Sequence, residues 1–105
     1  MSPDKCRKVV KARARGACER CAKEGGLTLH HRKKRSQGGD WTPQNCVMLC
    51  GSGTTGCHGW VEDNPDTAEV YGWHVRPWDD PLDVPILYHG GAFTYLTEDG
   101  GHAWR

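Results

Sequence analysis

Two short apolar stretches separated by a polar loop dominate the first half of the chain. Residues 27–31 alternate between apolar and polar side chains and predict a short strand. Residues 46–50 are apolar and predict a second strand. A Gly-rich segment must then turn the chain into residues 57–62, which suit the first turns of a helix with Thr54 or Thr55 as the N-cap. The predicted order is therefore strand, loop, strand, helix.

The second half of the chain shows weaker patterns. Asn64-Pro65-Asp66 is typical of a helix start, and the helix is expected to end near Gly72. Residues 73–75 suggest a short strand. Residues 84–88 and 93–97 flank a Gly-Gly turn and predict a β-hairpin, followed by a short tail.

The N-terminal residues mix basic side chains with small apolar ones. Residues 5–17 therefore predict either a short exposed helix or a basic arm, closed at Gly16. The sequence divides into a basic arm or helix (1–17), a core (18–64) and an acidic extension (65–105). Small size and this mixture of elements predict a small α+β fold.

Length and composition limit the number of domains, the size of the hydrophobic core and the expected location of the protein. A chain of 105 residues implies one domain, and with 36% hydrophobic residues and 14 glycines its core is marginal. A bound metal commonly compensates for such a core. No apolar run approaches the roughly 20 residues of a membrane span. The N-terminus has no apolar signal region, so we expect an intracellular, reducing location.

Charge is distributed unevenly along the chain. Residues 1–35 hold 12 of the 14 Lys and Arg and 3 of the 13 Asp and Glu, a net charge of +9, whereas residues 36–105 carry a net charge of −8. A basic segment of this kind favours a polyanion such as nucleic acid. The alternative is a solvated helix face and two halves that attract each other.

Six cysteines suggest metal binding. They are Cys6, Cys18, Cys21, Cys46, Cys50 and Cys57. Three disulfides would suit a secreted protein and a lone Cys-x-x-Cys a redox pair, but two thiol pairs in an intracellular chain favour structural zinc. The predicted zinc ligands are Cys18, Cys21, Cys50 and Cys57. Cys46 is the main rival and is more plausible as a small core residue.

Histidines stand between these cysteine pairs. Neighbouring strand residues point to opposite faces, so His30 and His31 cannot ligate one ion in the same way. His30, His58 and Glu62 are predicted to form an open metal site, with Glu62 one helical turn after His58. His31 is then a candidate general base. Asn45 is expected to orient His31 or to hold the loop. The other histidines, His74, His89 and His102, are expected to be polar surface residues.

The chain resembles the HNH endonucleases of the ββα-metal fold, in particular the small zinc-containing kind of bacteriophages. The resemblance runs from about Cys18 to Glu62. It rests on the motifs Cys18-Glu19-Arg20-Cys21, Leu29-His30-His31-Arg32, Ser36-Gln37-Gly38-Gly39-Asp40, Pro43-Gln44-Asn45, Leu49-Cys50 and Gly56-Cys57-His58-Gly59-Trp60. It implies a ββα-metal core stapled by a four-cysteine zinc site, with the predicted hairpin as a C-terminal extension.

The resemblance also implies roles for individual residues. His30 and His58 resemble the metal ligands, His31 the general base and Asn45 the middle residue of the family name. Family members often carry a further His four residues after His58, where this chain has Glu62. The implied catalytic cofactor is one divalent ion, Mg²⁺, Mn²⁺, Ni²⁺ or Zn²⁺, and a carboxylate at this position shifts the preference toward harder ions such as Mg²⁺ or Mn²⁺. The implied reaction is metal-dependent hydrolysis of DNA to a 5′ phosphate and a 3′ hydroxyl.

Two further expectations concern partners. The implied DNA contacts are the basic residues Arg32, Lys33, Lys34, Arg35, Arg13 and Arg15. Phage relatives often act with the terminase in genome packaging, which suggests such a partner in the host cytoplasm.

The alternative function is a non-catalytic zinc module that binds nucleic acid. A third interpretation makes residues 62–105, with Trp73, Trp78 and Trp104, an interaction surface.

Overall fold

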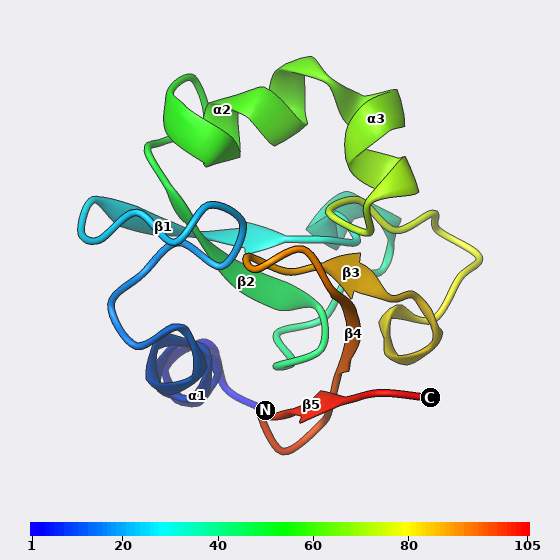
Figure 1. Ribbon diagram of the computed structural model, residues 1–105. Coiled ribbons are helices and arrows are strands. Elements are labelled where there is room, and N and C mark those ends of the chain that lie inside the picture. Colours follow the sequence, from blue (N-terminus) through cyan, green and yellow to red (C-terminus); the bar gives the residue numbers. More distant parts are fainter.

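The computed structural model describes all residues from Met1 to Arg105 as a small α+β fold (Figure 1). Its helices are α1 (Pro3–Ala14), α2 (Gly56–Asp63) and α3 (Pro65–Val70), with 3-10 turns at Arg35–Gln37 and Pro81–Asp83. Its strands are β1 (Leu27–His31), β2 (Cys46–Cys50), β3 (Ile86–Leu87), β4 (Phe93–Leu96) and β5 (His102–Ala103). None of the helices combines the length and apolar character that a membrane span would need.

The antiparallel hairpin of β1 and β2 is the centre of the molecule. Its register pairs His30 with Val47 and His31 with Cys46, and β1 has no other strand neighbour. Figure 1 shows α1 on one side of the hairpin and α2 with α3 on the other. Every residue of β2 is buried because both of its faces are covered, which explains its unbroken apolar sequence.

Each face of β2 contributes to its own hydrophobic cluster. Cys6, Val10 and Ala14 of α1 pack with Cys46 and Met48. On the other face, Val47 and Leu49 pack with a larger set that includes Val61, Ala68, Trp73, Ile86 and Leu96. Cys46 is fully buried and belongs to the first cluster, as expected of a core residue. The residues of α1 are therefore a packed helix and not a free arm.

The turn from β2 into α2 depends on glycine. Gly51 and Gly56 have φ values of +84° and +62°, and a Cβ at either position would collide with backbone atoms across the turn. Thr55 occupies the N-cap position, but its side chain makes no capping hydrogen bond. This close turn brings Cys57 back towards Cys50 and sets His58 in the first turn of α2.

The C-terminal extension differs from the sequence expectation in three respects. The segment Trp73-His74-Val75 is not a strand, and Trp73 is buried, whereas Trp78 and Trp104 are largely exposed. The tail is not free: β5 pairs with β4 and converts the predicted hairpin into a three-stranded sheet. A strand of two residues is too short to show the alternation of apolar and polar side chains by which a sequence predicts a strand.

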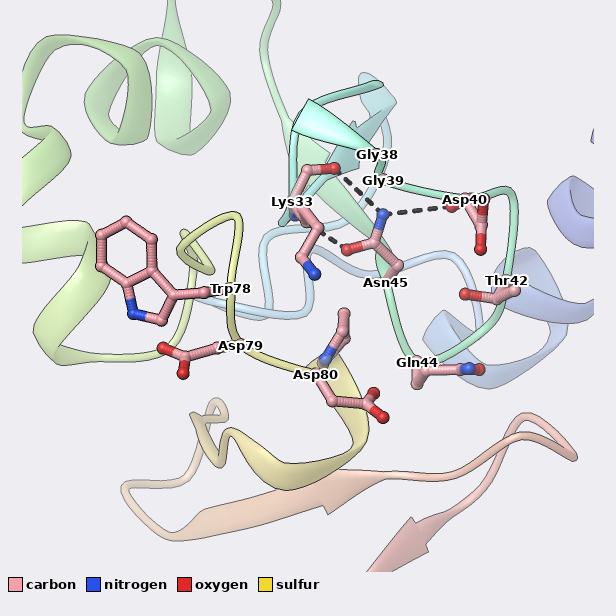
Figure 2. Close-up of a pocket in the computed structure, with 11 residues that line it drawn as sticks. Lys33, Gly38, Gly39, Asp40, Thr42, Gln44, Asn45, Trp78, Asp79 and Asp80 are labelled. Carbon is pink, nitrogen blue, oxygen red and sulfur yellow. Dashed lines mark hydrogen bonds between the residues drawn. The ribbon is translucent and has the colours of Figure 1, made fainter. Parts of the chain in front are cut away.

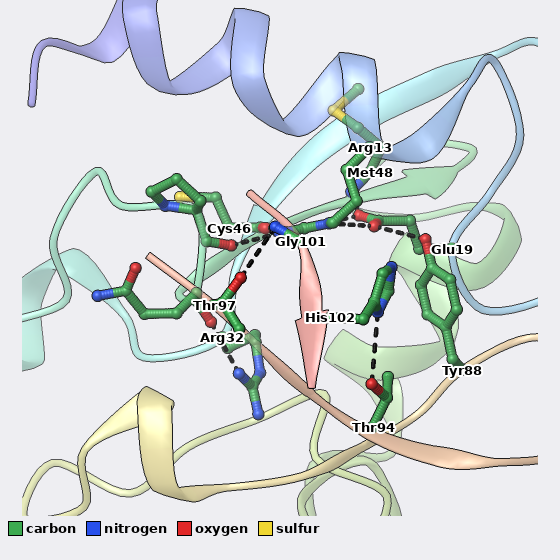
Figure 3. Close-up of polar contacts among 12 residues, drawn as sticks. Arg13, Glu19, Arg32, Cys46, Met48, Tyr88, Thr94, Thr97, Gly101 and His102 are labelled. Carbon is green, nitrogen blue, oxygen red and sulfur yellow. Dashed lines mark hydrogen bonds and ion pairs between the residues drawn. The ribbon is translucent and has the colours of Figure 1, made fainter. Parts of the chain in front are cut away.

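Buried arginine side chains join the extension to the core. Arg32 is fully buried, and its guanidinium donates to the backbone oxygens of Gly72, Gln44, Pro81 and Val84 at 2.7–3.2 Å. Arg13, whose side chain is 1% exposed, donates to both carboxylate oxygens of Glu19 at 2.6 and 3.1 Å. Glu19 also accepts from Tyr88 of the extension and from the Met48 amide (Figure 3). The interpretation of Arg13 and Arg32 as DNA contacts is therefore wrong, because protein acceptors engage both guanidinium groups.

Replacing Arg32 by methionine should destabilise the fold strongly. The variant leaves four backbone oxygens without their donor, and the expected loss is about 3 kcal/mol or more, a fall in Tm on the order of 10 °C. Lys34→Met, a matched change at an exposed neighbour, should alter Tm by only about 2 °C. Thermal unfolding followed by circular dichroism distinguishes the two, and equal Tm values would contradict this role of Arg32.

Candidate functional site

Four cysteine sulfurs converge beside the β2–α2 turn. The thiols of Cys18, Cys21, Cys50 and Cys57 lie within 4.8 Å of one another, and only Cys21 is exposed. The Cys21 and Cys50 sulfurs are 3.7 Å apart. Two of the ligands come from the tight turn after α1, which a backbone hydrogen bond from Ala22 to Cys18 closes. This set of four thiols fits a closed, tetrahedral zinc site.

Donors around the cluster are aimed at its sulfurs. The Cys57 amide donates to the Cys50 sulfur at 3.3 Å, and Arg20 donates to the Cys57 sulfur at 3.2 Å. The Arg20 guanidinium in turn lies over the Trp60 ring at 3.8 Å. Burial raises the pKa of the Cys18 thiol, and it raises that of Cys57 to about 12. Burial disfavours the negatively charged thiolates, whereas a bound metal cation would stabilise them. The hydrogen-bond donors of Cys57 and Arg20 also stabilise negative charge on the sulfurs.

A second group of metal-binding side chains lies on the α2 side of β1. One ligand atom each from His30, His58 and Glu62 lies within 4.8 Å of the others. His30 is buried, whereas the Glu62 side chain is 37% exposed, so the group is open to solvent on one side. The structure thus brings together the three residues that the sequence predicts as one metal site.

Hydrogen bonds determine which ring nitrogens face this site. Thr28 donates its hydroxyl hydrogen to the Gly51 carbonyl at 2.8 Å, so its oxygen accepts from Nδ1 of His58 at 2.6 Å. The Nε2 of His58 is then free for a metal. Similarly, Nε2 of His30 donates to the Trp73 carbonyl at 2.8 Å, which leaves the lone pair on Nδ1.

The contact between His30 and Glu62 fits a cation. Burial lowers the pKa of His30 to about 3, so its ring is neutral at neutral pH. Its unprotonated Nδ1 faces a carboxylate oxygen of Glu62 at 3.5 Å. Two acceptors that face each other without a proton repel, and a divalent cation between them would remove that repulsion.

His74 is a neighbour of this site that the sequence analysis assigned to the surface. It is half-buried, and its ring centroid is 5.2 Å from that of His30, compared with 5.3 Å for His58. Its Nε2 donates to the Val61 carbonyl at 2.7 Å. The His74 ring and the Trp73 carbonyl both belong to the extension and both lie beside His30. The extension therefore forms one wall of the site. Neither residue belongs to a local motif, so only the fold reveals them.

His31 lies on the opposite face of β1. Its ring contacts Trp41 edge-on at 4.4 Å, and its buried Nε2 has no hydrogen-bond partner. Burial lowers the pKa of His31, and the nearby Arg35 and Arg7 lower it further. His31 is thus neutral near pH 7, and this ring nitrogen is not committed to a structural hydrogen bond.

Asn45 holds the loop between the two strands. Its side-chain oxygen accepts from the Lys33 amide at 2.8 Å, and its Nδ2 donates to the carbonyls of Lys33 and Asp40 at 3.1 Å each (Figure 2). It forms no hydrogen bond with His31. Of the two roles considered for Asn45, the structure supports the loop-holding one. This bracing sets the position of the basic loop, in which Lys34 and Arg35 are exposed.

Comparison with known proteins agrees with this arrangement over part of the chain. Residues 18–59 match the model of the family described as HNH endonuclease. The matched segment contains the four cysteines of the thiol cluster and also His30, His31, Asn45 and His58. It ends before Glu62, Trp73 and His74. The comparisons with curated proteins and with solved structures gave no match.

Proposed function

We propose that the HNH segment makes this protein a metal-dependent endonuclease that hydrolyses phosphodiester bonds in DNA. The observation that carries the proposal is the group of His30, His58 and Glu62, in which two ring nitrogens and a carboxylate oxygen lie within 4.8 Å of one another. A divalent ion held there would supply Lewis-acid stabilisation of the scissile phosphate and of the leaving 3′ oxygen.

His31 is the proposed general base. It ends β1, whose outer edge pairs with no strand, so a phosphate at that edge can reach both faces of the strand. The neutral ring accepts a proton from the attacking water. Because Asn45 fixes the backbone of Lys33, the basic loop next to His31 keeps a defined position. Lys33, Lys34 and Arg35 are proposed to contact the DNA backbone. The exposed Arg15 is proposed as a further contact.

Some finer points of the proposal rest on the sequence resemblance. The cysteine tetrad is proposed to hold structural zinc, and reduced thiols suit an intracellular compartment such as the host cytoplasm. A phage origin and the terminase as partner are proposed on the resemblance to small phage enzymes. The catalytic ion is proposed to be Mg²⁺ or Mn²⁺, because Glu62 adds a carboxylate to two imidazoles.

The decisive experiment is nicking of supercoiled plasmid by the zinc-loaded protein with added Mg²⁺, Mn²⁺, Ni²⁺ or Zn²⁺. Wild type should nick in at least one metal. His31→Ala should lower the rate by about 10²–10⁴-fold, the usual contribution of a general base. Its affinity for the added metal should remain within about twofold, since His31 is outside the metal-binding group.

His89→Ala is the matched control, since the His89 side chain is exposed and belongs to neither group of metal-binding side chains. Equal nicking by wild type and His31→Ala would show that the base assignment is wrong. A wild type that binds DNA but nicks it in none of the four metals would instead support the non-catalytic zinc module.

A further inference from the structure

A groove separates α1 from the outer edge of β1, on the face opposite the metal-binding group. Its volume is about 550 Å³, and its lining includes Arg7, Lys11, His31, Arg35 and Trp41. None of the lining residues is acidic. The groove therefore combines three cations with no lining carboxylate, in a protein whose net charge is only +1.

Two of the three cations of the groove, Arg7 and Arg35, pack against one aromatic ring. The Arg7 guanidinium lies 4.7 Å from the centre of the Trp41 ring and that of Arg35 lies 5.6 Å from it. Trp41 also contacts the His31 ring edge-on. One carboxylate touches the group from outside: Asp4, which is 92% exposed, approaches Arg7 at 3.5 Å. An exposed pair of this kind is weak and yields easily to a phosphate.

The groove adjoins the candidate metal centre. Thr28 lines the groove and also hydrogen-bonds to His58 of the metal-binding group. His31 lines the groove, and its chain neighbour His30 belongs to the metal-binding group. The unpaired edge of β1 is therefore the boundary between the two sites, and an extended polyanion that crosses this edge contacts both.

We propose that this groove binds the phosphodiester backbone of a DNA strand next to the cleavage point. The inference rests on the proposed nuclease function and adds the path of the strand: across the free edge of β1, with adjoining phosphates on Arg7, Lys11 and Arg35. Arg7 and Lys11 are new DNA contacts of α1, in place of the buried Arg13 and Arg32. Contacts of this kind hold any sequence, because phosphates carry no base information.

Binding is measured by fluorescence anisotropy of a labelled duplex at several salt concentrations, in a His58→Ala background that prevents cleavage. The variant Arg7→Gln/Lys11→Gln should bind about tenfold more weakly at a fixed salt concentration. Its slope of log K against log[salt] should be smaller by about 2, one for each phosphate that the variant no longer neutralises. The matched control is Lys5→Gln/Lys8→Gln, which removes the same charge from exposed positions of α1 outside the groove. The control should bind within about twofold of the parent.

If the two double variants weaken DNA binding equally, the inference is overturned. The loss of affinity would then come from the change in net charge and not from this groove. An unchanged affinity of Arg7→Gln/Lys11→Gln would also overturn it. In both cases, nicking of plasmid by the wild type would leave the nuclease proposal intact. Failure of that proposal is recognised separately, as a wild type that does not nick in any metal.

Discussion

Replacement of Cys50 by serine is expected to leave the protein unfolded and free of zinc. The Cys50 sulfur lies 3.7 Å from that of Cys21 and accepts from the Cys57 amide, so it sits within the cluster of thiols. Structural zinc contributes about 10–16 kcal/mol in small zinc domains, which is as large as the whole stability of a typical domain, roughly 5–15 kcal/mol. Loss of one ligand should therefore exceed what the two hydrophobic clusters can offset.

The measurement combines zinc content with far-ultraviolet circular dichroism. Cys46→Ala is the matched control, because Cys46 is also buried but lies in the cluster with α1, away from the four thiols. This control should lose about 1–2 kcal/mol and keep one zinc per chain. A Cys50→Ser protein that keeps one zinc and a cooperative unfolding transition would refute the assignment of the tetrad.

His58→Ala should abolish binding of the second metal while the fold persists. His58 is only half-buried, at the start of α2, and its one protein hydrogen bond is to Thr28. Loss of an outer-shell partner already weakens metal sites by about 10–100-fold, so loss of a ligand from a group of three should cost more than about a hundredfold. Nicking should fall at least as much, since the proposed function places the ion at the scissile phosphate.

Titration calorimetry of the zinc-loaded protein with Mn²⁺ or Ni²⁺ measures this loss without reference to activity. His89→Ala serves as control and should bind like wild type. In thermal unfolding, the Tm of His58→Ala should lie within a few degrees of the wild-type Tm. This measurement separates loss of the metal site from loss of the fold. An unchanged affinity for both ions would exclude His58 as a ligand.

Contacts between the extension and the core explain why the candidate metal site is larger than the segment that matches the family model, residues 18–59. Within residues 18–59 lie His30 and His58, but Glu62 comes one helical turn later, and the carbonyl that orients His30 belongs to Trp73. His74 completes the row of rings beside His30. Arg32 joins the same extension to the core through backbone oxygens. The extension therefore shapes the metal-binding group from outside the matched segment.

The sequence by itself determined the features that depend on short-range geometry. The two-residue period of a strand is enough to place His30 and His31 on opposite faces of β1. The spacing of one helical turn is enough to place Glu62 beside His58. The cysteine pairs and the order of strands and helix in the core follow from local patterns in the same way, and the thiol cluster agrees with them.

Only the tertiary structure decided which basic side chains are engaged by protein acceptors and which are accessible to a ligand. Arg13 and Arg32 look like exposed cations in the sequence. In the structure, Glu19 and the backbone oxygens of Pro43 and Cys46 engage Arg13, and backbone oxygens 12–52 positions away engage Arg32. Arg7 and Lys11 look the same in the sequence and line an open groove. The physical reason is that burial of a long side chain is set by acceptors distant in the chain, which no periodicity of its own neighbours encodes.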